Sequence, residues 1–502
     1  MKKKKIIIGI DFGTTCCLVS TVINKKVIIL NVFNKKNFFP TIIHFKKNST
    51  IVGWKAQKFL HTDIKNTITS IKRFIGMSYS ELKKKKINIP YKILTNKNKE
   101  LIFHTNIGNI TVSDIIQKIF TYIKNKIEKK FQTSIYGAII TVPAYFNDIQ
   151  KKTIRKSAKL INLKLLRLLN EPTAAAIAYG LEKKRKGFIC VYDIGGGTFD
   201  VSILKISKGI FEVLATNGDC HLGGDDFDNS LAHFLYSKMK KKKKLTDILF
   251  KELLIIAEQV KIQLSKTSSV TIKFLHSKIN CSILEFNILI YPYIKKTLNI
   301  LKQALQDANV KKSNIKDIIL VGGSTYIPLI RKKIHNFFKK KTLQSLNPVE
   351  VVAHGAGLQA NFLYHKKNKN IQSILLLDIV PISIGIELLG GIMEKMIVKG
   401  SKIPTEIVKI FTTFKDNQTG FCINIFQGES KYVKNCKLLK KFKIKKLPPK
   451  KAGEIKIIIA FRIDADNLLS VTTQEKKSKI KHKIQMDTIY HNKNINKNNN
   501  AH

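Results

Sequence analysis

The stretch VYDIGGGTFD (residues 191–200) decides the fold that we expect for this chain. An apolar run leads into Asp193, three glycines and Thr198 follow, and a second strand-like run begins at Phe199. Glycine reaches positive φ at little cost, so successive backbone N–H groups in such a turn can face one concavity and hold an anion. Asp193 ends the first strand, where it could hold a hydrated divalent cation beside that anion. The stretch therefore predicts a hairpin that binds phosphate.

A similar pattern lies near the N-terminus. Residues 6–8 are apolar, and Asp11, Gly13, Thr14 and Thr15 follow in the stretch GIDFGTT. A single glycine-rich turn would be explained as an ordinary hairpin. Because the pattern occurs twice, it predicts two similar halves that grip one polyphosphate.

The chain divides by composition into four segments. Over residues 1–364, strands alternate with helices around the two hairpins, which is typical of a mixed α/β domain. Residues 365–381 read as a polar linker that contains a short apolar run. In residues 382–486 helical periodicity fades and short apolar runs alternate with turns, as in an all-β sandwich. Residues 487–502 are rich in Asn and Lys, and we expect them to be disordered.

The net charge of +56 is typical of a nucleic-acid-binding protein, but only six of the 90 basic residues are arginines. Reading of base edges and bidentate phosphate contacts favour arginine. The lysines are also scattered along the chain, so we expect a solvated basic surface and no specific nucleic-acid partner.

The apolar runs and the cysteines indicate a cytoplasmic protein. No run reaches the roughly 18 apolar residues that a membrane span needs, and Asp11 cuts short the apolar run that follows the N-terminal lysines. Seven cysteines without a Cys-x-x-Cys pair fit a reducing compartment and give no metal signature. We therefore expect neither membrane association nor a cysteine-bound metal.

Further candidates for a ligand site lie later in the chain. Gly322, Gly323 and Ser324 follow a buried strand, and ligands of open α/β sheets bind at such carboxyl ends. Glu258, Lys261 and Ser265 share one face of the helix expected over residues 247–265, and a solvated helix face is the alternative to a binding role.

Nine stretches follow one another along the chain: GIDFGTT, IKRFIG, ITVPAYFND, NEPTAAAIAYG, YDIGGGTFDVSI, LATNGD with HLGGDDFD, ILVGGST, LLLD and IDADNLLSVT. In this order they resemble the DnaK-type chaperones of the heat shock protein 70 family. Two short stretches, residues 391–395 and 411–419, look most like the HscA branch of that family, which serves iron–sulfur cluster assembly.

The resemblance implies an α/β actin-like ATPase of two similar lobes, a hydrophobic linker and a β-sandwich that clamps an extended peptide. It also implies slow hydrolysis of ATP with Mg²⁺, coupled to closing of the clamp. A J-domain co-chaperone stimulates hydrolysis in this family, and the client of the HscA branch is the scaffold protein that carries the nascent cluster.

The resemblance also assigns roles to individual residues of the ATPase. Lys72 would stabilise charge on the transferring phosphoryl group and orient the attacking water, with Glu171 near that water and the metal. Asp11 and Asp193 would hold Mg²⁺ through water. The other nucleotide contacts would come from Gly13, Thr14, Thr15, Gly195, Gly196, Gly197, Thr198, Asp200, Glu258, Lys261, Ser265, Gly322, Gly323 and Ser324.

The resemblance also implies two further groups of residues, one that couples the ATPase to the β-sandwich and one that binds the client. The apolar residues Leu375, Leu376 and Leu377, with Asp378, would form a linker switch that docks in one nucleotide state; a buried strand is the alternative. The residues expected to line the peptide channel, which could otherwise be ordinary core, are Ile386, Leu389, Phe411, Phe414, Phe421 and Ile423.

The chain departs from the family pattern at several positions. Tyr326 stands where relatives commonly have an arginine that stacks on adenine, Val349 replaces an aspartate, and Lys151 replaces an arginine. These departures put nucleotide affinity and interdomain coupling in question. After the predicted sandwich we expect only a polar tail in place of the helical lid of relatives, and therefore faster exchange of bound peptide.

Three alternatives compete with an HscA-like chaperone. A general unfolded-protein chaperone would use the same residues. A sugar or acetate kinase on the same fold would need a small-molecule pocket and no β-sandwich with a Leu-Leu-Leu-Asp linker. A binding protein that has lost hydrolysis is disfavoured by the intact Lys72, Glu171, Asp193 and Thr198.

Overall fold

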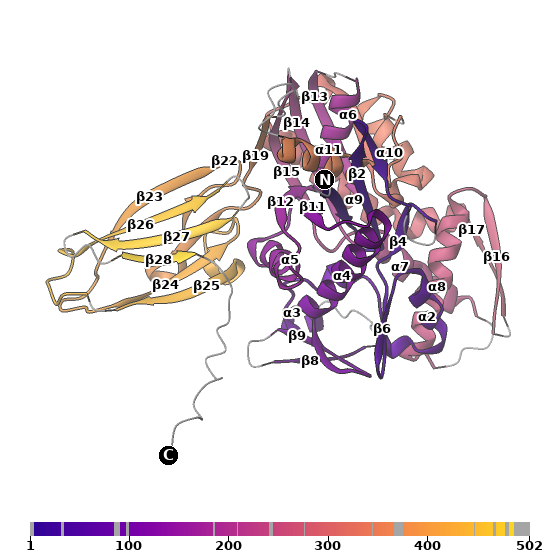
Figure 1. Ribbon diagram of the computed structural model, residues 1–502, viewed down its shortest axis with the longest axis horizontal. Coiled ribbons are helices and arrows are strands. Elements are labelled where there is room, and N and C mark those ends of the chain that lie inside the picture. The colour runs from indigo at the N-terminus through magenta and orange to yellow at the C-terminus, as the bar shows by residue number, and fades with distance from the viewer. Residues whose placement is uncertain are drawn as a thin grey trace, which may run out of the picture. The chain divides into compact units, whose positions relative to one another are not determined.

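The computed structural model divides into two compact units, Met1–Pro381 and Ile382–His502 (Figure 1). The predicted tail 487–502 and most of the predicted linker, residues 366–374, lie outside the residues that the structure describes. The described residues are 5–31, 35–84, 91–96, 100–183, 186–207, 209–239, 244–275, 277–343, 345–365, 375–445, 447–464, 468–476 and 481–485.

The first unit contains two large sheets with the same central arrangement. The first sheet runs β12-β11-β1-β2-β3 and carries β4 on β2. Its central strand β1 is parallel to β11 and antiparallel to β2. The strands are β1 (Ile6–Phe12), β2 (Cys16–Ile23), β3 (Lys26–Ile29), β4 (Phe38–Pro40), β11 (Ile135–Val142) and β12 (Leu165–Asn170).

Within the first unit, the second sheet runs β18-β13-β14-β15-β19. Its strand β13, next to the edge strand β18, is parallel to β18 and antiparallel to β14, as β1 is to β11 and β2. The two predicted phosphate hairpins, β1-β2 and β13-β14, therefore hold equivalent places in the two sheets. The strands are β13 (Gly187–Ile194), β14 (Phe199–Ser207), β15 (Ile210–Asp219), β18 (Ile315–Val321) and β19 (Leu375–Ile379).

Two helices, α6 (Glu171–Lys183) and α11 (Val351–His365), pack against each other between the sheets. α11 contacts β1, β2 and β11 of the first sheet, and α6 contacts β13, β14 and β18 of the second. Glu171 begins α6 directly after β12, so it is fixed at the end of a sheet strand. The predicted mixed α/β character of this unit is confirmed.

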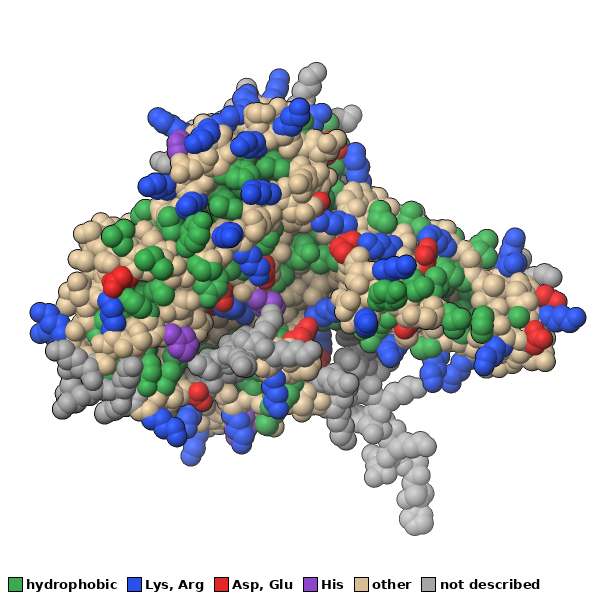
Figure 2. Space-filling view, turned by 180° about the vertical axis from the view of Figure 1, so that it is seen from behind, with side chains coloured by type: hydrophobic (Ala, Val, Ile, Leu, Met, Phe, Trp, Pro, Cys, Tyr) green, Lys and Arg blue, Asp and Glu red, His purple; other side chains and the backbone are tan. Residues whose placement is uncertain are grey.

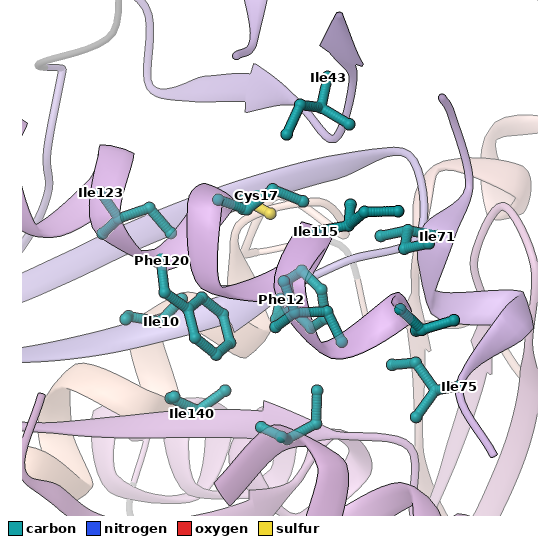
Figure 3. Close-up of a cluster of buried hydrophobic side chains, with 14 of the residues drawn as sticks. Ile10, Phe12, Cys17, Ile43, Ile71, Ile75, Ile115, Phe120, Ile123 and Ile140 are labelled. Atoms are coloured by element: carbon teal, nitrogen blue, oxygen red, sulfur yellow. The ribbon is translucent and has the colours of Figure 1, made fainter. Parts of the chain in front are cut away.

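A buried apolar cluster fixes the strand and the turn that carry two predicted site residues (Figure 3). Ile10 and Phe12 of β1 point into it, and the ring of Phe12 meets that of Phe120 edge-on with centroids 5.2 Å apart. Because side chains alternate along a strand, Asp11 projects to the opposite face. Ile71 and Ile75 belong to the same cluster, so they anchor the turn that carries Lys72.

The remaining elements of the first unit surround these layers. Asn147 caps α5: its side chain accepts from Gln150 N while the Gln150 side chain accepts from Asn147 N. The helices are α1 (Trp54–Gln57), α2 (Phe59–Thr62), α3 (Tyr79–Lys84), α4 (Val112–Phe131), α5 (Asp148–Leu160), α7 (Gly224–Ser237), α8 (Asp247–Leu264), α9 (Ile283–Asp307) and α10 (Pro328–Phe338). The 3₁₀ turns are η1 (Ile64–Asn66), η2 (Ile71–Phe74), η3 (Lys312–Asn314) and η4 (Gly323–Tyr326). The small sheets hold β5 (Ile43–Lys46), β6 (Ser49–Val52), β7 (Thr67–Ile68), β8 (Lys92–Thr95), β9 (Leu101–Thr105), β10 (Gly108–Thr111), β16 (Ser269–Phe274) and β17 (Ser277–Ser282).

The second unit holds two antiparallel sheets, β21-β20-β24-β25 and β23-β26-β27-β28. In β26 the alternate residues Ile457, Ile459, Phe461 and Ile463 are buried, which is the pattern of a sheet with one face on the core. The predicted change to all-β structure is confirmed. The elements are β20 (Ile384–Leu388), η5 (Leu389–Gly391), β21 (Ile392–Ile397), β22 (Lys402–Ile403), β23 (Thr405–Thr412), β24 (Phe421–Gln427), η6 (Val433–Asn435), β25 (Lys437–Ile444), β26 (Lys456–Ile463), β27 (Leu469–Glu475) and β28 (Lys481–Gln485).

None of the helices that the structure describes combines the length and the apolar character that crossing a bilayer requires.

Candidate functional site

The tips of the two predicted phosphate hairpins meet. A Cβ added to Gly196 would lie 2.4 Å from Thr15 Cγ2, and one added to Gly197 would lie 2.7 Å from Thr14 Cγ2. Side chains at these two positions would therefore push the hairpins apart. The structure brings the two turns together as the doubled sequence pattern predicted.

The second hairpin, β13-β14, also accepts hydrogen bonds from the start of α7 and from the third glycine turn, Gly322–Ser324. The backbone N–H of Gly224 donates to Gly195 O over 3.0 Å, and that of Asp225 donates to Gly196 O over 2.7 Å. Ser324 Oγ donates to the same Gly195 carbonyl over 2.8 Å. The start of α7 and the third glycine turn thus hold the backbone of this hairpin through its Gly195 and Gly196 carbonyl groups.

The third glycine turn approaches the second hairpin closely. Gly322 has a φ of 87°, and a Cβ there would lie 2.3 Å from Ile194 O, so both its conformation and its surroundings favour glycine. Gly323 has open space where its side chain would be. The turn Gly322–Ser324 therefore lies against the Asp193 hairpin, and its predicted contact with a nucleotide stays a prediction.

A buried lysine lies among buried carboxylates next to the hairpins. Lys72 Nζ donates to Glu171 Oε1 over 2.6 Å, and the two residues are 3% and 6% exposed. Thr141 Oγ1 donates to Asp11 Oδ1 over 3.1 Å, and Tyr145 N donates to Asp200 Oδ1 over 3.1 Å. Side chains from β1, η2, α6 and β14 thus converge on one small region.

The carboxylates repel one another electrostatically. Burial raises the pKa of Asp11 to about 7, and Glu171 adds to the rise while Lys72 opposes it. Burial also raises the pKa of Asp200 to about 8, again with help from Glu171. The pKa of Asp193 is raised well above its usual range by burial and then by Glu171, Asp200 and Asp11.

The same carboxylates shift the pKa of Lys72, the cation among them. Burial alone would lower its pKa, but Glu171, Asp11 and Asp193 outweigh burial and raise it. One lysine does not balance several buried carboxyl groups, so an additional cation would favour the ionised forms of these groups.

The donor set fits a hydrated Mg²⁺ better than a directly bound metal. Among the residues that the structure describes, no three His, Cys, Asp or Glu side chains are placed to hold a metal ion together. Mg²⁺ keeps several waters and binds through one or two carboxylates and substrate phosphates. Asp11 and Asp193, which end equivalent strands beside the two hairpins, are suited to hold those waters.

The predicted residues of α8 differ in their surroundings. Lys261 Nζ lies 2.6 Å from Asp228 Oδ2 and 3.5 Å from Gly224 O, which places it beside the second hairpin. Ser265 Oγ donates within its own helix to Lys261 O over 3.0 Å, and Glu258 is exposed. Lys261 alone of the three is joined to the hairpin region by a hydrogen bond.

Arg73 belongs to this region although the sequence did not identify it as a site residue. Its guanidinium lies 2.9 Å from Asp226 Oδ1 and 3.6 Å from Asp225 Oδ2, and it donates to His221 O over 3.3 Å. η2, which carries Arg73, packs on the first sheet, whereas the two aspartates begin α7. Arg73 therefore joins the two halves of the unit across the hairpins.

The departures from the family pattern are also placed by the structure. Tyr326 is 44% exposed, donates to Asn347 Oδ1 over 2.9 Å, and has the Arg331 guanidinium 5.3 Å from its ring centre. Val349 N donates to Asn347 Oδ1 as well. Lys151 is buried, and burial lowers its pKa although Asp378 and Asp148 oppose the change.

The predicted linker switch is a strand of the first unit. β19 pairs in parallel with β15, so that Leu376 lies opposite Phe211. Leu376 packs against the core while Leu375 is half exposed. Asn170 Nδ2 donates to Asp378 Oδ2 over 2.6 Å. The apolar run therefore forms the strand that the sequence left as the alternative, and its role as a switch stays a prediction.

The predicted peptide-binding residues lie in the second unit in three kinds of surroundings. Ile386 and Ile423, on the neighbouring strands β20 and β24, are buried, and Phe411 and Phe421 are half buried. Leu389 in η5 and Phe414 after β23 are 75% and 67% exposed. The structure thus places apolar side chains in solvent at two turns, and the channel itself stays a prediction.

Comparisons with known proteins agree with this arrangement. A family model described as "Hsp70 protein" matches residues 7–500. The chain is 45% identical over 493 residues to "Chaperone protein HscA" of Buchnera aphidicola subsp. Acyrthosiphon pisum (strain Tuc7), covering 98% of this chain and 81% of that protein.

Two further relatives carry similar names. The HscA chaperone of Buchnera aphidicola subsp. Baizongia pistaciae (strain Bp) is 45% identical over 488 residues, 97% of this chain and 95% of that protein. "Chaperone protein HscA homolog" of Haemophilus influenzae (strain PittGG) is 40% identical over 486 residues, 97% of this chain and 78% of that protein. The chain therefore belongs to the Hsp70 family, and within it resembles the HscA chaperones over nearly its whole length.

Proposed function

We propose that this chain is an ATP-dependent chaperone. Its first unit is an actin-like ATPase, and its second unit is a β-sandwich that binds an extended stretch of a client protein. The observation that carries the proposal is the meeting of two phosphate hairpins beside a buried Lys72–Glu171 pair, in a chain that belongs to the Hsp70 family.

In this proposal the hairpins hold the phosphate chain of ATP. Backbone N–H groups of Gly13–Thr15 and of Gly196–Thr198 would face the phosphates, while the Gly195 N–H closes the hairpin by donating to Thr198 O, and Lys261 adds positive charge beside the second hairpin. Asp11 and Asp193 would hold the waters of Mg²⁺. When bound, Mg²⁺ neutralises charge that develops on the phosphate oxygens.

Lys72 and Glu171 carry the chemical step. Phosphoryl transfer depends on positioning and electrostatic stabilisation, so a fixed ammonium group beside the transferred phosphoryl lowers the barrier. The 2.6 Å contact with Glu171 holds Lys72 Nζ in place, and burial of both groups strengthens the field of the lysine. Thr198 and Asp200 order the γ-phosphate and its waters.

The client is proposed to be the scaffold protein of iron–sulfur cluster assembly, with a J-domain co-chaperone as the second partner and the cytoplasm as the compartment. Similarity to HscA chaperones and the stretches at residues 391–395 and 411–419 support this assignment. A general folding chaperone is the alternative.

A steady-state ATPase assay with the two partners tests the assignment. We expect slow basal hydrolysis that rises about tenfold or more when a J-domain protein and a scaffold-derived peptide are added together, following the scale of allosteric coupling. Equal stimulation by random hydrophobic peptides would instead identify a general chaperone, and absence of any ATP hydrolysis would reject the proposed function.

Arg73→Ala is expected to speed nucleotide release about tenfold, because it removes the guanidinium that joins η2 to the start of α7. The expected size corresponds to about 1.4 kcal/mol, in the range for partly buried charged hydrogen bonds. A stopped-flow chase of a fluorescent ADP analogue measures the release rate. Lys124→Ala, which removes a lysine bonded to Ile161 O far from the hairpins, is the matched control. Equal release rates for wild type and Arg73→Ala would reject this role.

Leu376→Asp is expected to abolish stimulation of the ATPase by client peptide while basal hydrolysis stays within about twofold. The new carboxylate would be forced into the core beside β15, so β19 would leave its place on the sheet. Leu375→Asp, at a half-exposed position on the other face of the strand, should reduce stimulation far less. Full stimulation of Leu376→Asp would show that docking of this strand does not couple the two activities.

A further inference from the structure

The outer face of α9 carries a row of large apolar side chains. The inner face of this helix is buried through residues such as Phe286, Ile290 and Ile294. On the opposite face Leu284, Ile288 and Tyr291 follow one another at spacings of four and three residues, so they form one stripe along the helix. We call these three residues the α9 stripe.

The α9 stripe is unusually exposed. Leu284 and Ile288 are 71% and 73% exposed, and Tyr291 is 44% exposed. Among the described large hydrophobic residues, only Leu389 is more exposed than Ile288, and Leu389 belongs to the proposed client site. Single exposed apolar residues need no explanation, but adjacent ones on one helix face indicate an interaction surface.

The surroundings of the α9 stripe are basic. Lys295 and Lys302 continue the same helix face, and both are exposed. Lys333 of α10 places its Nζ 4.8 Å from the centre of the Tyr291 ring. The carboxylate on this end of the helix, Glu285, is already bonded to Lys238 and to Ser282. Among these described residues, the charges left for a partner are the positive ones of Lys295, Lys302 and Lys333.

We propose that the α9 stripe is the docking site of an acidic amphipathic helix from a partner protein. A helix that presents apolar residues at matching spacing would bury the three side chains, and its acidic flanks would face Lys295, Lys302 and Lys333. A second copy of this chain is a poor occupant, because its net charge of +56 would bring lysines against lysines. Figure 2 shows Lys and Arg side chains scattered over the face of the molecule that it draws.

A stapled helical peptide serves as the probe. It carries leucines at positions i, i+4 and i+7, glutamates on both flanks and a fluorescein label, and the staple prevents it from binding as an extended client. Fluorescence anisotropy with the full-length chain should show saturable binding that weakens with added salt. The double variant Leu284→Ser/Ile288→Ser should weaken binding at least tenfold.

Three comparisons make the test specific. Leu160→Ser/Ile248→Ser, which removes two exposed apolar residues elsewhere, should bind the probe like wild type. Leu389→Ser/Phe414→Ser, which alters the proposed client site, should also bind it like wild type. A stapled peptide with lysines in place of the glutamates should not bind.

Several results would overturn the proposal. Failure of the acidic probe to bind wild type rejects the site, and so does binding of the probe to Leu284→Ser/Ile288→Ser as tightly as to wild type. The proposal also fails if the lysine-flanked peptide binds wild type as tightly as the acidic probe does, or if Leu389→Ser/Phe414→Ser no longer binds the acidic probe. Sedimentation of a dimer that Leu284→Ser/Ile288→Ser abolishes would make a second copy the occupant and would likewise overturn it. None of these results depends on whether the chain hydrolyses ATP.

Discussion

Lys72→Ala is expected to slow single-turnover ATP hydrolysis by about 10²–10³-fold, the usual loss when one group that stabilises transition-state charge is removed. ATP binding should change much less, because the hairpin backbones and Mg²⁺ provide most of the contacts to the phosphates. The substitution also leaves Glu171 buried without the ammonium that lies 2.6 Å away. Rapid mixing of enzyme in excess over radiolabelled ATP isolates the chemical step.

Two controls separate this effect from a loss of structure. The thermal midpoint and the ATP affinity of Lys72→Ala show whether the site is still formed. Lys72→Met keeps the length of the side chain while removing the charge, so it should lose hydrolysis as Lys72→Ala does. Hydrolysis at the wild-type rate in either variant would remove Lys72 from the chemical step.

Gly223→Ala is expected to weaken ATP binding by about 100-fold. An added Cβ would lie 2.6 Å from the carbonyl atoms of Gly196 and 2.7 Å from Gly197 N, all of them backbone atoms of the second hairpin. Backbone cannot rotate aside as a side-chain end can, so the hairpin must shift. A hydrogen bond to a charged phosphate contributes about 1.5–3 kcal/mol, so misplacing one or two hairpin N–H groups weakens binding on the order of 10²-fold. Gly223 has an extended backbone with φ −177°, so the effect comes from this contact alone.

Titration calorimetry of ATP into Gly223→Ala measures the affinity, and the thermal midpoint without nucleotide reports on folding. An unchanged midpoint with weak binding is the expected pair of results. An affinity equal to that of wild type would mean that the position of the Gly195–Gly197 turn does not determine phosphate binding.

Local patterns predicted the parts of this structure that depend on neighbours in sequence. The Asp193 hairpin and the Asp11 hairpin each follow from a few consecutive residues, because turn chemistry is local. Their meeting at Gly196 and Gly197 followed from finding the same pattern twice.

Long-range pairings could not be read in the same way. Arg73 is one of six arginines, and nothing beside it in sequence indicates that Asp225 and Asp226 are its partners. α9 was not anticipated, since Leu284 and Ile288 lie on its outer face and blur the apolar periodicity by which a surface helix is identified. Leu376 likewise became a sheet strand because β15 lies beside it, which is a tertiary contact.

Release of a bound client peptide in the two nucleotide states tests the central claim most directly. The wild-type chain is loaded with a fluorescent scaffold-derived peptide, and dissociation is followed after mixing with excess unlabelled peptide and either Mg-ATP or Mg-ADP. If ATP in the first unit controls the clamp in the second, release should be at least tenfold faster with ATP than with ADP. The same release rate in both nucleotides, from a chain that binds both, would contradict an ATP-driven chaperone.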